Sequence, residues 1–172
     1  MSEQPSGGSK PRIVVGVDGS VSSEQALRWA LRQARLTGAG IQAVIAWHFP
    51  VISGGHAWPP AGVMVSADDF RKIAERALAD TVSRATSDDV PAPVTQKVLE
   101  GDAAAVLIRE SAGADLLVVG SRGHGGLAEA MLGSVGQHCV HHAACPVVIV
   151  RGDVTTAGPS TATDAFAQQP VH

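Results

Sequence analysis

Hydrophobic residues gather in five short runs along the chain, and each run predicts a β-strand. The runs cover residues 12–18 (RIVVGVD), 41–47 (IQAVIAW), 94–99, 115–119 and 146–150 (PVVIV). The first run is β-branched and apolar through its centre, which is typical of a strand that is buried on both faces of a sheet.

Between the runs, apolar residues recur at helical spacing and predict four helices, at 22–36, 67–85, 103–112 and 134–142. Ser22 and Gln25 are placed to form a capping box at the start of the first helix, and glycines at 38 and 40 end it. Asp68 and Asp69 are expected to cap the second helix, and Asp102 the third. The apolar face of the first helix consists of Ala26, Leu27, Ala30, Leu31 and Ala34.

Strands that alternate with helices predict parallel strands joined by right-handed crossovers, and therefore an α/β fold. The length of 172 residues suits one domain. We expect this domain to span residues 11–151, after a disordered lead at 1–10 and before a disordered tail at 152–172, since both ends are rich in small and polar residues. The loop at 50–66 is long for a compact domain and contains Trp58 as a possible lid or anchor.

Composition excludes several classes of partner. The net charge is −3 and the chain has three Phe, three Trp and no Tyr, so neither nucleic acid nor an anionic membrane is indicated. The first ten residues lack the apolar core of a signal peptide, and no run approaches the ~20 residues of a membrane span. Two cysteines do not make a disulfide scaffold. These features predict a cytoplasmic protein.

The segment at 120–135 (GSRGHGGLAEAMLGSV) contains five glycines and follows a predicted strand. Ligands of open parallel sheets bind beyond the carboxyl ends of the strands, and the N-terminus of a helix at Ser134 favours an anion. The segment is therefore either a phosphate-binding loop or an ordinary glycine-rich turn. It is not a Walker loop, because no lysine follows its last glycine, and VGVDGS is not a Rossmann fingerprint.

The order of residues in this segment, G-2x-G-9x-G-S from Gly120 to Ser134, resembles the ATP-binding signature of the universal stress protein family. The resemblance extends over about residues 12–151 and includes IVVGVDGS near the start and HHAACPVVIV near the end. It implies a Rossmann-like fold, an open five-stranded parallel sheet in the order 3-2-1-4-5 with helices on both faces.

The resemblance also implies a site for ATP with Mg²⁺ between the first and fourth strands. Asp18 would lie near the ribose and phosphates, and the end of the second strand would meet adenine. Some members of the family prefer cyclic AMP, and this alternative remains open. The residues implied for nucleotide binding are Gly16, Asp18, Ala46, Trp47, Gly120, Ser121, Arg122, Gly123, His124, Gly125, Gly126, Gly133, Ser134 and Val135.

The same residues have plainer interpretations. The sequence DGS at residues 18–20 is also typical of a turn, so Asp18 can be a turn residue. Arg122 and His124 can be loop side chains exposed to solvent. His138, His141, His142, Cys139 and Cys145 are types that zinc uses, but the segment also resembles the family's closing helix, so no metal site is predicted. Trp29 and Trp47 are expected to pack.

The resemblance also implies a homodimer, because members of the family often pair through their last strands, which here run from Pro146 to Val150. We expect an ATP-dependent regulator in the stress response, acting on an unknown protein partner and with at most slow hydrolysis, because no Walker lysine or activating base is evident. No catalytic residue is predicted. The alternatives are a nucleotide hydrolase or adenylyl-transfer enzyme, and a dimeric module without a ligand.

Overall fold

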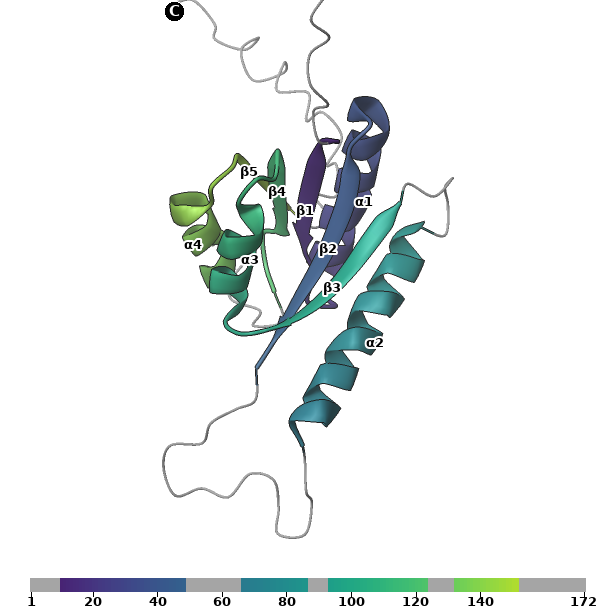
Figure 1. Cartoon of the computed structure of the whole chain (residues 1–172), viewed down its shortest axis with the longest axis vertical. Helices are drawn as coiled ribbons and strands as arrows, with labels where there is room; N and C mark the ends of the chain where they lie inside the picture. The colour runs from purple at the N-terminus through teal and green to yellow at the C-terminus, as the bar shows by residue number, and fades with distance from the viewer. Residues whose placement is uncertain (1–9, 49–65, 87–92, 124–131, 152–172) are drawn as a thin grey trace, which may run out of the picture.

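Five parallel strands form one sheet in the order β3-β2-β1-β4-β5 (Figure 1). The computed structural model describes residues 10–48, 66–86, 93–123 and 132–151. The order and parallel pairing confirm the predicted fold. The strands are β1 (Arg12–Gly16), β2 (Gly40–Trp47), β3 (Val94–Glu100), β4 (Leu116–Gly120) and β5 (Val147–Val150).

Helices cover both faces of the sheet, two on each side (Figure 1). The helices are α1 (Val21–Thr37), α2 (Ala67–Thr86), α3 (Ala103–Ser111) and α4 (Ser134–His142). α1 and α2 pack on one face, while α3 and α4 pack on the other. The largest difference from prediction is at β1, which ends at Gly16 rather than at 18.

The two faces of β1 supply two separate hydrophobic clusters, as the two-residue period of a strand requires. Ile13 and Val15 pack with α1 and α2, where Leu27 is fully buried. Val14 points to the other face, where it packs with Leu107 of α3. A strand buried on both sides reads as a continuous apolar run, and this explains why its pattern lacks alternation.

The cap of α1 differs from the prediction. Ser20, rather than Ser22, is the N-cap residue, and its Oγ accepts a hydrogen bond from the Ser23 amide at 3.2 Å. The proposed Ser22–Gln25 capping box was wrong because the helix starts one residue earlier, at Val21. Ser22 is buried instead. Gly38 ends the helix with φ 71°, a left-handed conformation that glycine adopts without strain.

The caps of α2 and α3 follow the prediction in part. The Asp102 side chain accepts from the Ala105 amide at the start of α3, as expected. At α2, Ser66 and Asp69 cap each other: the Ser66 amide donates to Asp69 Oδ2 and the Asp69 amide donates to Ser66 Oγ. Asp68 does not cap; it forms an ion pair with Lys72 at 2.6 Å.

Several predictions fall on residues that the structure does not describe. These concern the lead at 1–9, the tail at 152–172, most of the long loop with Trp58, and His124, Gly125 and Gly126 of the glycine-rich segment. Within the described residues, no helix has the length and apolar character needed to cross a membrane.

One ion cluster joins α1 to α2 at the surface. Glu24 accepts from Arg84 Nε at 2.7 Å and from Arg28 Nη2 at 3.2 Å. Arg28 Nη2 also donates to the Arg84 carbonyl at 2.6 Å. The hydrogen bond from Arg84, together with that from Arg28, lowers the pKa of Glu24, although burial of the carboxyl opposes this effect. The cluster therefore holds Glu24 in its charged form.

Replacing Glu24 by Gln is expected to destabilise the fold at pH 7 by up to about 1 kcal/mol, a modest value because the Arg84 side chain is 49% exposed. The folded state lowers the pKa of Glu24 below its value of about 4.3 in the unfolded chain. The charged carboxylate therefore stabilises the fold at a pH above about 4.3, and this stabilisation is lost as the pH falls through the folded-state pKa. Urea denaturation at pH 7 and at pH 3 tests this.

A matched control is Glu75→Gln, since Glu75 makes a 3.6 Å ion pair with Arg71 on the exposed surface of α2. The control should change stability little at either pH. A Glu24→Gln deficit that persists unchanged at pH 3 would show that packing, rather than charge, causes the loss.

Candidate functional site

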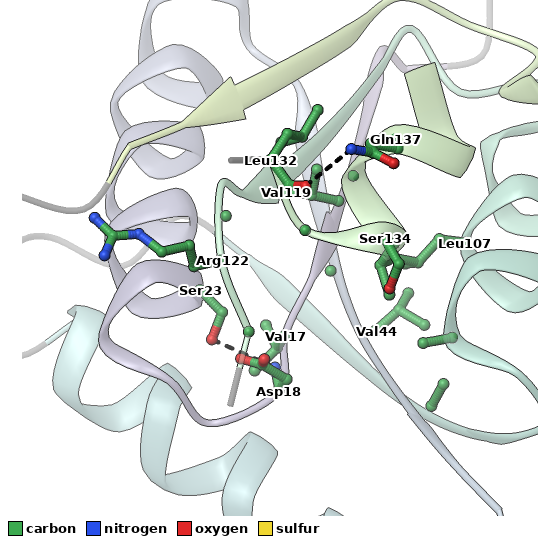
Figure 2. Close-up of a pocket in the computed structure, with 18 residues that line it drawn as sticks. Val17, Asp18, Ser23, Val44, Leu107, Val119, Arg122, Leu132, Ser134 and Gln137 are labelled. Carbon is green, nitrogen blue, oxygen red and sulfur yellow. Dashed lines mark hydrogen bonds between the residues drawn. The ribbon is translucent and has the colours of Figure 1, made fainter. Parts of the chain in front are cut away.

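A pocket of about 540 Å³ opens at the carboxyl ends of β1 and β4 (Figure 2). Here the strand order reverses, since β1 lies between β2 and β4, and open α/β sheets bind ligands at this point. The described residues that line it are Gly16, Val17, Asp18, Ser23, Val44, Ala46, Ala103, Leu107, Val119, Gly120, Arg122, Gly123, Leu132, Gly133, Ser134, Val135, Gly136 and Gln137.

Gly120 allows the glycine-rich segment to lie directly against the start of α1. A Cβ at this position would be 2.9 Å from the backbone C and O atoms of Ser22, which is closer than real Cβ contacts. The Ser22 hydroxyl also accepts from the Arg122 amide at 3.4 Å. This explains why Ser22 is buried rather than exposed as a cap, and it fixes where the chain leaves β4.

Asp18 lies between the end of β1 and the first turn of α1, and its carboxylate is held there by hydrogen bonds. Oδ1 accepts from the Ser20 amide at 3.0 Å and from the Ser20 hydroxyl at 2.6 Å. The Asp18 amide donates to the Ser23 hydroxyl at 3.3 Å, a bond drawn in Figure 2. The result is a carboxylate with a defined orientation at the pocket wall.

Gly123 approaches this carboxylate closely. A Cβ on Gly123 would lie 2.7 Å from Asp18 Oδ2. The absence of a side chain at Gly123 therefore brings the glycine-rich segment and the end of β1 together on one side of the pocket.

The N-terminus of α4 forms another wall. Gly133 is its N-cap residue, and no side chain caps this end among the described residues. The Gly133 amide donates to the Ser121 carbonyl at 3.0 Å, which ties the start of α4 to the beginning of the glycine-rich segment, just after β4. The first-turn residues Ser134, Val135 and Gly136 line the pocket. Amides of a first helical turn and the helix dipole together favour an anion.

Part of the pocket surface is apolar. Val44, Leu107 and Val119 contribute to it, and Figure 2 shows Val44 and Leu107 close to Ser134. Leu107 reaches this position because Gly16 has no side chain: a Cβ there would be 2.8 Å from Leu107 Cδ1. The pocket therefore combines an apolar wall with an anion-favouring helix end.

Most of the predicted site residues that the structure describes line this pocket. Two do not: Trp47 packs against the hydrophobic cluster of α1 and α2, as Trp29 also does, and Ser121 is buried and acts through its carbonyl. Arg122 lines the pocket with its backbone, but Figure 2 shows its guanidinium extending away from Ser134 and Leu107. The lining residues are Gly16, Asp18, Ala46, Gly120, Arg122, Gly123, Gly133, Ser134 and Val135.

Sequence reasoning identified the N-terminus of α4 but missed the apolar surface and two further residues near that helix start, Gly136 and Gln137. The sequence predicts Leu107 as a core residue of a helix, because apolar residues that line a pocket have the same helical spacing as residues packed in the core. Gln137 had a weak signal, because it lies about one turn after a predicted helix start. Its side-chain Nε2 donates to the Leu132 carbonyl at 3.1 Å. The missed lining residues are Val17, Ser23, Val44, Ala103, Leu107, Val119, Leu132, Gly136 and Gln137.

The described lining residues include one carboxylate, Asp18, and one cationic residue, Arg122. The lysines that the structure pairs lie elsewhere: Lys72 contacts Asp68, and Lys97 contacts Glu110 at 2.9 Å. Among the described residues no group of three or more His, Cys, Asp or Glu side chains is arranged to hold a metal ion.

The cysteines do not share a surface with the histidines of α4. Cys139 is fully buried in the cluster of α3 and α4, and burial raises the pKa of its thiol to about 11. Burial also raises the pKa of Cys145. Cys139 is therefore separated from the exposed His138, His141 and His142, and its thiol is protonated at neutral pH.

Comparison with known proteins gives a consistent family. The model of the universal stress protein family matches residues 11–151. A universal stress protein of Mycolicibacterium smegmatis is 34% identical over 154 residues, which cover 86% of this chain and 50% of the relative. One of Mycobacterium tuberculosis is 32% identical over 145 residues, which cover 83% of this chain and 46% of the relative. The chain thus spans about half the length of these relatives.

Solved structures agree on the fold. A universal stress protein in complex with cAMP is similar with a TM-score of 0.61 and 24% identity, covering 83% of this chain and 98% of that one. A universal stress protein family protein from Arabidopsis thaliana with AMP bound has a TM-score of 0.54 and 22% identity, and the match covers 87% of this chain and 97% of that one. The universal stress protein from Archaeoglobus fulgidus in complex with dAMP has a TM-score of 0.53 and 20% identity, and the match covers 83% of this chain and 98% of that one.

Proposed function

Because the chain belongs to the universal stress protein family, we propose that it binds ATP with Mg²⁺ in the pocket between β1 and β4. It would act as a nucleotide-dependent regulatory protein of the stress response. The observation that carries the proposal is the N-terminus of α4, which has no side-chain cap and lines the same pocket as Asp18 and the glycine-rich segment. A helix end of this kind binds phosphate groups.

The pocket combines the two kinds of surface that a nucleotide needs, an apolar surface and a helix N-terminus. The apolar wall of Val44, Leu107 and Val119 suits a base, and a volume of about 540 Å³ lies within the ordinary range for small-molecule sites. The phosphates would lie at Ser134–Gly136 and the glycines, where the backbone can approach closely. Asp18 would face the ribose or the Mg²⁺ ion, since carboxylates are preferred ligands of Mg²⁺.

Family structures with cAMP, AMP or dAMP bound support an adenine nucleotide as the ligand. We favour ATP over a monophosphate because the helix N-terminus and the glycine-rich segment offer backbone donors to more than one phosphate. Cyclic AMP is the second candidate, favoured by the fold likeness to a cAMP complex.

A regulatory role fits the pocket better than catalysis. Of the charged lining residues described, Asp18 is engaged by Ser20, and the Arg122 guanidinium extends away from the pocket (Figure 2). No described lysine lines the pocket, so the parts that stabilise phosphoryl transfer in known enzymes are not assembled among these residues. Bound ATP would act by favouring one conformation that a protein partner recognises.

We also propose a homodimer in which β5 pairs with β5 of a second copy. β5 is an edge strand with half-buried residues along its whole length. An apolar edge with unpaired backbone groups is a site for strand addition unless it is covered.

Calorimetric titration of ATP with Mg²⁺ into nucleotide-stripped protein is expected to give a Kd on the order of micromolar. Gly123→Val should weaken binding at least about tenfold, because a Cβ at this position would lie 2.7 Å from Asp18 Oδ2 and would displace that carboxylate. Gly133→Ala is the sharper variant, because its Cβ would lie no closer than 3.6 Å to any described residue. The fold should persist while the methyl group blocks the phosphates.

Gly40→Ala is the matched control, because a Cβ at Gly40 meets nothing within 4 Å and the residue lies at the start of β2, away from the pocket. It should bind like the wild type. The absence of ATP binding by a well-folded wild type would contradict the proposal. Parallel titrations with cyclic AMP and AMP would then decide whether another adenine nucleotide is the ligand.

ATP hydrolysis at saturating substrate should be slower than about one turnover per second, which is below the range of typical enzymes. Phosphate release by the purified protein measures this, with the Gly133→Ala variant as the control for contaminating phosphatases. Faster turnover that disappears in the variant would favour the hydrolase alternative.

Sedimentation equilibrium is expected to give twice the chain mass of 17.6 kDa at micromolar concentration. Hydrogen exchange should then show that the amides of residues 147–150 lose protection on dilution, because only the dimer covers the β5 edge. The other edge strand, β3, serves as the internal control and should not change. A monomeric mass at all concentrations would refute the pairing.

A further inference from the structure

The exposed face of α4 has three histidines that take no part in the pocket. His138, His141 and His142 are all exposed, and none of them lines the nucleotide pocket. None forms a salt bridge with a described residue. The face therefore presents imidazole groups to solvent on a helix that is otherwise anchored by the buried Cys139.

Two of the three imidazoles are placed as neighbours. His138 and His142 are one helical turn apart, and side chains with this spacing lie on the same side of a helix. Their ring centroids are 6.3 Å apart with an angle of 38° between the planes. His141 is also near His142, with centroids 6.2 Å apart, but adjacent helical residues point in directions that differ by a large angle and do not converge. The convergent pair is His138 and His142.

The hydrogen bond of His138 determines which of its nitrogens is available. Nδ1 lies 3.0 Å from the Ser134 carbonyl oxygen. A carbonyl oxygen only accepts, so Nδ1 must carry the hydrogen. In the neutral ring the lone pair then lies on Nε2, at the far end of the side chain. Histidines that bind metals commonly donate their other ring N–H in this way, often to a backbone carbonyl.

We propose that His138 and His142 bind a divalent late transition-metal ion at the surface of α4, with water in the remaining positions. Metal–nitrogen bonds are about 2.1 Å long, so small rotations of the two exposed side chains bring both rings onto one ion. Neutral imidazole suits Cu²⁺, Ni²⁺ and Zn²⁺, and Cu²⁺ should bind most tightly by the general order of divalent affinities. The site is independent of the nucleotide proposal.

Metal binding would join two successive turns of a helix that has only nine residues. An ion that binds only the folded state adds stability by mass action. The first of the joined turns contains His138, whose Nδ1 is held by the Ser134 carbonyl one turn earlier. The ion would therefore stabilise the N-terminal end of α4, which borders the pocket.

The test is a titration of tag-free, nucleotide-stripped full-length protein with CuCl₂ and, separately, ZnCl₂. We expect one Cu²⁺ ion per chain at this site, with electron paramagnetic resonance showing coupling to two imidazole nitrogens. His142→Gln should weaken binding at least about tenfold while leaving the His138–Ser134 bond intact. His138→Gln should have the same effect, and both should abolish the metal-dependent rise in Tm.

The matched controls are His141→Gln, on the same helix, and His48→Gln, an exposed histidine just after β2. Both should bind Cu²⁺ like the wild type. All four substitutions are at exposed positions, and circular dichroism will confirm that the variants fold. Equal losses in all four variants, or no loss in His142→Gln, would overturn the site and indicate an adventitious ion only.

Discussion

The position of β1 between β2 and β4 is the constraint on which the rest of the structure depends. The chain leaves β1 for one neighbour and returns to pair with β1 on its other side. α1 therefore covers one face and α3 the other. The loops that follow β1 and β4 then diverge, and the space between them is the pocket.

Close approach by glycine converts this opening into a specific site. At Gly120 and Gly123 the missing side chains bring the segment after β4 against Ser22 and against Asp18. At Gly16 the missing side chain allows Leu107 to form the apolar wall. Gly133 differs, because a Cβ there would fit within the protein. Among the described residues no close contact requires glycine at this position, and a ligand in the adjoining pocket would account for it.

Strand order and the placement of the glycines were predictable because they depend on short sequence patterns and on a family resemblance. The runs at 12–18 and 146–150 have few alternatives to buried strands, and the glycine spacing marks the loop. The apolar wall was not predictable, because Leu107 has the same helical spacing as any core residue. The cap of α1 was missed because Ser20, Ser22 and Ser23 are all good capping residues, and only the contact between Ser22 and Gly120 decides among them.

The central claim is that the N-terminus of α4 receives the phosphates of a nucleotide. The most direct measurement is a set of ¹H–¹⁵N NMR spectra of the protein with and without ATP and Mg²⁺. The account predicts the largest shift changes at the amides of Ser134, Val135 and Gly136, with smaller changes at Asp18 and Gly123. Unchanged amides at α4, with changes confined to other surfaces or absent, would contradict it.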